Sequence, residues 1–175
     1  MKKYFNLLAV LLMFTTILLL TGCGEKREDL QFKGEEGSIT FNVIKDKGYK
    51  ISTDKKDLRT SREQGALVGD NFKIGIEFND DYNYFFDSDW KKLKKARKDN
   101  PEYKEVEYSG IKAIQYFYGG YNCYEVLLPC GDSKEYFLNL SVYGSKDTEK
   151  AAKEAIESKE VQDVLNHITE IKSKK

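Results

Sequence analysis

The stretch between Tyr103 and Tyr143 consists of short extended runs separated by only a few turn residues each. The runs are rich in Tyr, Phe, Ile and Val, residue types that favour β-strands. They are Tyr103–Tyr108, Ile111–Tyr118, Cys123–Pro129 and Tyr136–Tyr143. Ser109-Gly110, between the first two runs, is typical of a two-residue β-hairpin. Because such short connections join strands that run in opposite directions, the sequence predicts an antiparallel meander.

Further extended runs precede this meander. Phe72–Phe78 alternates apolar with polar or small residues, which predicts a strand with one buried face. Ser38–Ile44 alternates in the same way, and Tyr49–Thr53 is expected to form a brief strand. Residues 54–62 are polar without a clear period, so no element is predicted there.

Three segments have helical spacing of their apolar residues. They are Asp89–Lys98, Thr148–Glu157 and Glu160–Ile171. In the first, Trp90, Leu93 and Ala96 are expected to form the inner stripe. Because helices are grouped and do not alternate one by one with strands, the sequence predicts an α+β fold. We expect an antiparallel β-sheet flanked by helices, in a single domain of residues 38–171.

The first 22 residues have the order of features found in secretory signals. Lys2 and Lys3 precede an apolar run, Leu7–Leu20, that is too short to span a bilayer comfortably. The run leads into Leu20-Thr21-Gly22-Cys23, which resembles the lipobox of bacterial lipoproteins. The resemblance implies that residues 1–22 are a signal peptide and that the Cys23 thiol carries diacylglycerol. A transmembrane helix is the alternative, and it gives the domain the same topology.

A lipid anchor on Cys23 would hold the mature protein at the outer face of the cell membrane. Residues 23–37 are expected to be the lipidated cysteine and a flexible, charged tether that lifts the domain clear of the lipid headgroups. The many lysines favour a Gram-positive source.

Charge and cysteine usage narrow the function classes. The chain has 29 basic and 29 acidic residues, and loss of residues 1–22 leaves a slight acidic excess. Nucleic-acid binding usually needs a concentrated basic face, so no nucleic-acid partner is expected. Cys123 and Cys130, if they share one strand, lie too far apart for a disulfide. We expect two free thiols in or near the core, without a metal or redox role.

The order of predicted elements resembles the PsbP-like family, which includes photosystem-associated proteins, a nuclear transport factor and bacterial lipoproteins. The resemblance rests on Gly48-Tyr49-Lys50-Ile51, the strand Phe72–Phe78, the helix with Trp90, the hairpin at Ser109-Gly110 and a last helix that reaches Ile168. It implies an α/β/α sandwich around an antiparallel sheet. It also implies binding of other proteins, without a cofactor or a shared active site, so no ligand residue is carried over.

Aromatic side chains are the candidates for partner binding. Tyr82, Tyr84 and Phe85 lie in a polar loop, and Tyr121 follows a glycine pair. Aromatic residues anchor many protein interfaces, so these four are expected to contact a protein partner. Exposed aromatic rings can also stack on sugars, which leaves an envelope carbohydrate-binding or hydrolytic domain as the alternative.

The sequence contains few candidates for catalytic residues. The acidic segment Asp80–Asp89 departs from a calcium loop because Phe86 replaces the turn glycine, so no metal is expected. Glu125 stands among apolar residues and could act as an acid or base, but an edge position or an ion pair with Lys112 is the expectation. His167 is expected to face solvent. Since no catalytic triad can be assembled, the sequence favours a non-catalytic binding module.

Overall fold

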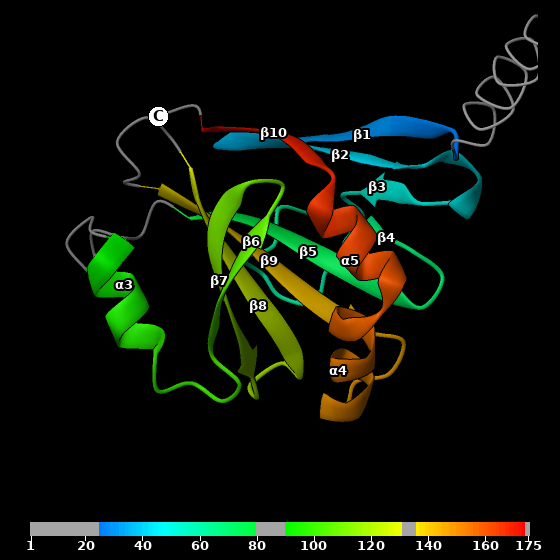
Figure 1. Ribbon diagram of the computed structural model, residues 1–175. Helices are drawn as coiled ribbons and strands as arrows, with labels where there is room; N and C mark the ends of the chain where they lie inside the picture. The colour runs from blue at the N-terminus through cyan, green and yellow to red at the C-terminus, as the bar shows by residue number, and fades with distance from the viewer. Residues whose placement is uncertain (1–24, 80–89, 131–135, 174–175) are drawn as a thin grey trace, which may run out of the picture.

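The computed structural model describes residues 25–79, 90–130 and 136–173. Within those ranges it contains two antiparallel sheets and three α-helices (Figure 1). The predicted α+β class is therefore confirmed. The strands are β1 (Arg27–Lys33), β2 (Gly37–Ile44), β3 (Lys50–Ser52), β4 (Gly65–Val68), β5 (Phe72–Asn79), β6 (Lys104–Tyr108), β7 (Ile111–Tyr118), β8 (Cys123–Cys130), β9 (Tyr136–Gly144) and β10 (Ile168–Ser173). The helices are α3 (Trp90–Arg97), α4 (Glu149–Glu157) and α5 (Lys159–Asn166), and a 3₁₀ turn, η1 (Lys45–Lys47), follows β2.

The larger sheet has seven strands in the order β3-β4-β5-β9-β8-β7-β6, and each neighbouring pair is antiparallel. Strands β6 to β9 form the predicted meander. At its first hairpin both turn residues have positive φ, 53° at Ser109 and 77° at Gly110. Positive φ at both central positions is the type I′ turn, whose twist matches that of the flanking strands. The local turn therefore fixes the register of β6 on β7.

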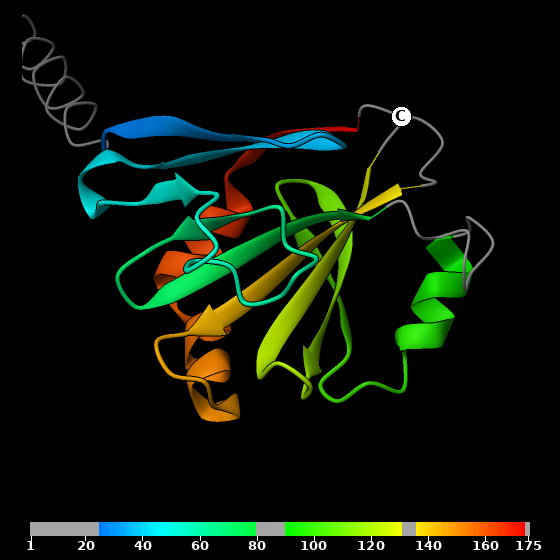
Figure 2. The same cartoon turned by 180° about the vertical axis from the view of Figure 1, so that it is seen from behind.

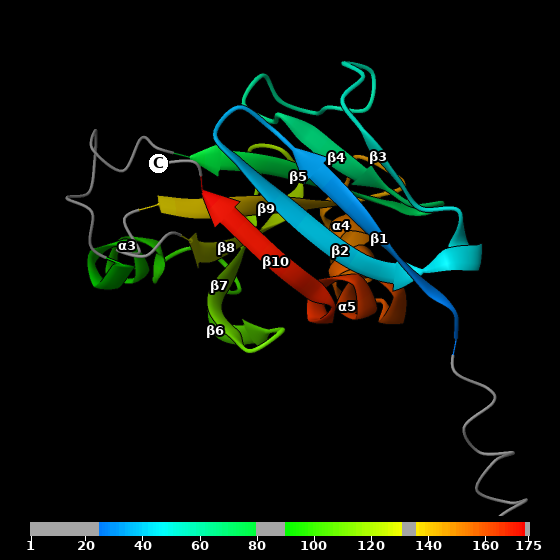
Figure 3. The same cartoon turned by 90° about the horizontal axis from the view of Figure 1, so that it is seen from above.

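The smaller sheet, in the order β1-β2-β10, lies over one face of the larger sheet together with α4 and α5 (Figures 1, 2 and 3). The main core lies between these layers and includes Ile76 of β5, Leu140 of β9, Phe41 of β2 and Leu165 of α5, all fully buried. Helix α3 packs on the opposite face through Leu93, which joins a smaller core cluster. Alternation along each strand thus supplies two faces with different neighbours.

The flexible tether predicted for residues 23–37 is wrong for most of the part that the structure describes. Arg27–Lys33 is strand β1, which pairs with β2 along its whole length. Phe32 of β1 is buried in the main core, and a turn closed by Gly34 N–H donating to Gly37 O (2.8 Å) joins the two strands. The domain therefore begins at about residue 27, not at residue 38. Strand β1 was not predicted because most of its residues are charged or polar, which in sequence resembles a solvated tether.

The C-terminal segment also differs from the prediction. The expected helix Glu160–Ile171 ends at Asn166, and Ile168–Ser173 forms the edge strand β10 of the smaller sheet. The three-residue spacing of Ile168 and Ile171 suits a helix and not a regular strand, and in β10 a register shift between Ile168 and Glu170 accommodates it. Strand β4 was also missed, since four residues are too few to establish a period. In α3, Ala96 is exposed, so it does not belong to the inner stripe.

Candidate functional site

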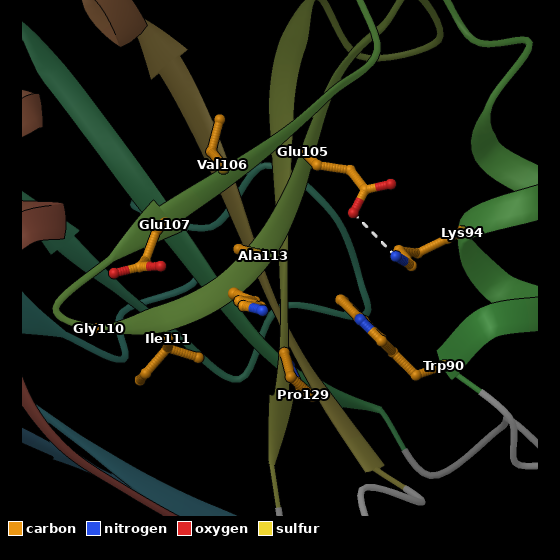
Figure 4. A pocket seen from close by; sticks show the side chains of 10 residues that line it. Trp90, Lys94, Glu105, Val106, Glu107, Gly110, Ile111, Ala113 and Pro129 are labelled. Carbon is orange, nitrogen blue, oxygen red and sulfur yellow. Dashed lines mark hydrogen bonds and ion pairs between the residues drawn. The ribbon is translucent and has the colours of Figure 1, made fainter.

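An open groove of about 850 Å³ lies between α3 and the β6–β7 hairpin (Figure 4). Trp90 and Lys94 point from α3 toward the hairpin, and Pro129 of β8 lies near them. The remaining lining residues come from β6, β7 and their turn: Glu105, Val106, Glu107, Gly110, Ile111, Lys112 and Ala113. The groove therefore exists only because α3 packs on this face of the sheet.

Charged side chains of both signs line this groove. Lys94 Nζ lies 2.8 Å from Glu105 Oε2, and the contact connects the helix to the edge strand (Figure 4). Glu107 stands opposite Lys112 in the β6–β7 register. The Glu105 side chain keeps 61% of its surface exposed, so this ion pair contributes little to stability. Trp90 packs on the smaller core cluster and is partly buried. The groove thus offers one aromatic ring and a balanced set of charges to a ligand.

The edge of β6 that borders the groove has backbone groups directed away from the sheet. Strand β6 is the last strand on its side of the larger sheet. Tyr108 and Ile111 flank the two-residue turn, so they exchange both backbone hydrogen bonds. Because hydrogen-bonded and non-hydrogen-bonded pairs alternate, Glu105 and Glu107 direct their N–H and C=O groups outward. An extended segment could pair with these groups.

The aromatic residues predicted to bind a partner do not gather at this groove. Tyr82, Tyr84 and Phe85 lie outside the described residues. Tyr121 is the exposed large apolar side chain among those described, at 41% exposure, and its ring packs on that of Tyr118 at a centroid distance of 5.6 Å. It follows the end of β7, whereas the groove surrounds the beginning of β7. The two features are separate surfaces.

Three buried glutamates lie on the face of the larger sheet that α3 partly covers. Glu63, Glu77 and Glu125 have exposures of 5%, 7% and 8%. Glu125 accepts a hydrogen bond from the Tyr116 hydroxyl on the neighbouring strand. The expected edge position or ion pair with Lys112 is therefore wrong: β8 is a central strand, and Lys112 stands opposite Glu107. The tyrosine hydroxyl replaces the lysine as the partner of this carboxylate.

Glu63 attaches the segment before β4 to this face. Its Oε1 accepts from the Tyr143 hydroxyl at 2.5 Å, and its Oε2 accepts from the Arg59 N–H at 2.7 Å. A β-carbon at Gly75 would lie 2.5 Å from the Glu63 carboxyl carbon, so glycine leaves the space that this side chain occupies. Burial, followed by the hydrogen bond to Glu63, raises the pKa of Tyr143. The contacts restrain residues 59–63 over the sheet.

Glu77 makes weaker contacts on the same face. Arg62 Nε lies 3.8 Å from Glu77 Oε1, and Asn139 Nδ2 donates to Glu77 Oε2 at 3.3 Å. Burial raises the pKa of Glu77, while the Arg62 guanidinium opposes that change. The same carboxylate raises the pKa of Arg62. The face therefore combines a desolvated acid with two tyrosine-bound acids, and the sequence indicated only one of the three.

Neither cysteine has the environment of a reactive thiol. Cys123 and Cys130 are free and buried, as predicted. Burial raises the pKa of Cys130 to about 12 and also raises the pKa of Cys123. Thiolate chemistry is disfavoured at such sites.

His167 follows α5 with 43% of its side chain exposed, and its Nδ1 lies 2.8 Å from the Asp163 carbonyl oxygen.

No three His, Cys, Asp or Glu side chains are grouped to hold a metal ion in the part of the chain that the structure describes. The acidic segment Asp80–Asp89 lies outside that part. The predicted signal peptide of residues 1–22 and the predicted lipid site Cys23 also lie outside that part. Within residues 25–79, 90–130 and 136–173, no helix is long and apolar enough to cross a membrane.

Comparison with protein-family models, with curated proteins and with solved structures finds no match to this chain. The functional interpretation therefore rests on the sequence and on the geometry described above. Sequence reasoning missed the groove residues Glu105, Glu107 and Lys112. The charged residues Lys104, Glu105 and Glu107 within the predicted strand were the available signal, because charged edge strands are common where a sheet ends in solvent.

Proposed function

We propose that this chain is a lipid-anchored module at the outer face of the cell membrane that binds a protein partner and has no catalytic activity. Leu20-Thr21-Gly22-Cys23 supports the anchor, since the basic start, apolar run, small residues and cysteine occur in the order of a lipoprotein signal. Acyl chains on Cys23 would hold the domain at the bilayer. The many lysines of the chain favour a Gram-positive source.

The observation that carries the binding proposal is the groove beside the outer edge of β6. Glu105 and Glu107 offer outward backbone groups there, and α3 supplies the opposite wall. An extended segment of a partner can add to such an edge as a further strand, with its side chains in the groove. Basic residues opposite Glu107 would be favoured, because opposite charges across strands attract.

The buried glutamates support a module without catalysis. Glu63 and Glu125 each accept a tyrosine hydrogen bond, and the Glu63 contacts hold a loop on the sheet. The groove is lined by other residues, so these acids do not face a ligand there. The helices on both faces of the larger sheet support a PsbP-like α/β/α arrangement as part of this proposal.

One observation favours a second function. Trp90 stands in the groove with carboxylates and lysines around it, and an aromatic ring flanked by polar groups suits a sugar. An envelope glycan is therefore the alternative ligand. It would occupy the same groove but would need Trp90 and not the backbone of β6.

A proline substitution distinguishes these two ligands. Glu107→Pro removes an outward N–H without removing a β6–β7 hydrogen bond, and proline is tolerated on edge strands. Glu107→Ala is the matched control, because it removes the side chain and keeps the N–H. We expect affinity capture from solubilised envelope to recover a protein with wild type and Glu107→Ala, but not with Glu107→Pro. Circular dichroism and thermal melting would verify that the variants fold.

Other outcomes of this capture would change the proposal. A partner retained by Glu107→Pro but lost by Tyr121→Ala would move the binding surface to the β7–β8 turn. Binding to a glycan array, without a protein partner and lost in Trp90→Ala, would favour the carbohydrate function.

The anchor is tested by Cys23→Ser, which is expected to leave the protein unprocessed or released. Normal processing with full membrane retention would contradict it.

A further inference from the structure

The ordered domain begins very close to the predicted lipid site. The Lys26 carbonyl accepts a hydrogen bond from the Lys45 N–H at 2.9 Å, so the backbone is already fixed at Lys26. Only Gly24 and Glu25 lie between Lys26 and Cys23. A fully extended chain covers about 3.3–3.6 Å per residue, so Cys23 and Lys26 can be separated by about 11 Å at most. A domain held this closely cannot turn freely above the membrane.

The end of the domain at which β1 begins carries several exposed lysines. The start of β1, the end of β2, η1 and the start of β3 meet at this end, as Figures 1 and 3 show. Lys26, Lys45, Lys47 and Lys50 are exposed there. Glu25, Asp46 and Asp70 are the exposed acids at this end, and Lys47 Nζ lies 3.2 Å from Glu160 Oε1. Lysines and acids are therefore about equal in number around the attachment point, and the lysines are the groups there that can contact lipid phosphates.

We infer that this end of the domain rests on the bilayer, with Lys26, Lys45, Lys47 and Lys50 against the phosphates of anionic lipid headgroups. The inference depends on the lipid anchor proposed above. The short link sets which end approaches the membrane, and the lysines fix the tilt, because basic residues near an anionic surface are attracted within a Debye length. No tether then lifts the domain above the headgroups.

This orientation places the groove away from the membrane. Helix α3 and the groove beside β6 lie at the end of the molecule opposite the start of β1 (Figures 1 and 3). The free edge of β6 would therefore face outward, where a partner from the envelope can approach it.

Fluorescence quenching in vesicles tests the orientation. A single cysteine at position 45 (Lys45→Cys) carries a fluorophore in the lipidated full chain, which is reconstituted into phosphatidylglycerol vesicles with headgroup-labelled quencher lipids. Glu35→Cys, in the exposed turn at the far end of β1, is the matched control, since seven strand residues extend about 20 Å or more. Native Cys123 and Cys130 are buried, so the reagent is selective.

We expect loss of fluorescence at position 45 and little loss at position 35. Equal quenching at both positions in vesicle-bound protein would overturn the orientation while leaving the anchor intact. Protein that does not float with the vesicles would overturn the anchor and the orientation with it. In Lys47→Gln/Lys50→Gln, or with phosphatidylcholine alone, quenching at position 45 is expected to weaken. Unchanged quenching in both cases would overturn the part assigned to the lysines.

Discussion

The two faces of the seven-stranded sheet differ in what they bury. The face under α4, α5 and the smaller sheet is almost wholly apolar, with Ile76, Val126 and Leu140 fully buried. The opposite face buries Glu63 and Glu125 among tyrosines, together with a small apolar cluster under α3. A single strand therefore contributes apolar side chains to one face and polar side chains to the other. In β8, for example, Val126 follows Glu125, so the two side chains lie on opposite faces.

The two faces therefore contribute to the fold in different ways. Apolar burial supplies most of the stability and is tolerant of the identity of the neighbour. A buried carboxylate requires a particular partner, because an unpartnered polar group costs free energy. The apolar face thus holds the layers together, whereas the polar face selects one position for the loop that carries Glu63.

Truncation on the apolar face should have the largest effect. Leu140→Ala leaves a cavity between the sheets and is expected to lower the free energy of unfolding by about 2–5 kcal/mol. Urea denaturation measures the change. Lys150→Ala on the exposed side of α4 is the control and should stay within about 0.5 kcal/mol of wild type. A small loss in Leu140→Ala would show that the layers can close over the cavity.

Removal of one hydroxyl on the polar face should cost less. Tyr143→Phe takes away the donor to Glu63 and is expected to cost about 1.5–3 kcal/mol, the range for hydrogen bonds to charged groups. Tyr121→Phe is the matched control, because that side chain is exposed and should tolerate the change. Equal melting temperatures of the two variants would argue against a restraining role for Glu63.

Filling the space beneath Glu63 should have a comparable or smaller effect. Gly75→Ala brings a β-carbon against the Glu63 carboxyl group and is expected to cost about 1–3 kcal/mol. Glu63→Ala removes the obstacle, so the double variant should lose less than the two single losses combined. Additive losses in a urea-based double-mutant cycle would show that the clash is relieved elsewhere.

The smallest effect is expected at Glu77 and depends on pH. Burial raises the pKa of Glu77 above its ordinary value near 4.5, so its protonated form is favoured in the folded state. Its contribution to stability is then greatest below pH 4.5 and decreases as pH rises through the folded-state pKa. Glu77→Gln should match wild type near pH 4 and be more stable at pH 7. A less stable variant at pH 7 would mean that attraction to Arg62 outweighs burial.

Local sequence signals predicted the meander well because each strand and turn carried its own pattern. Ile111–Tyr118 was predicted to the residue, and Ser109-Gly110 adopts the expected turn. Segments whose role depends on distant neighbours were missed. β1 looked like a charged tether, and β10 looked like the end of a helix, because both are edge strands that exist only by pairing with β2.

The candidate groove could not be predicted because it forms between elements. Trp90 and Lys94 belong to one helix, and Glu105 and Glu107 to an edge strand; only packing of α3 on the sheet brings them together. The buried glutamates illustrate the same limit. Glu125 was noticed by its apolar neighbours, but nothing near Glu63 in the sequence indicated that Tyr143 would become its partner.

The sequence by itself determined the α+β class, the antiparallel meander and the two free thiols, because periodicity, turn chemistry and strand geometry are local properties. The signal-like first residues and Cys23 are also the basis for the proposed location of the protein at the cell membrane. Only the tertiary structure decided where the domain begins, which acids share a face and where a groove opens. Those features depend on contacts between residues far apart in the chain, whose free energies appear only when the layers pack.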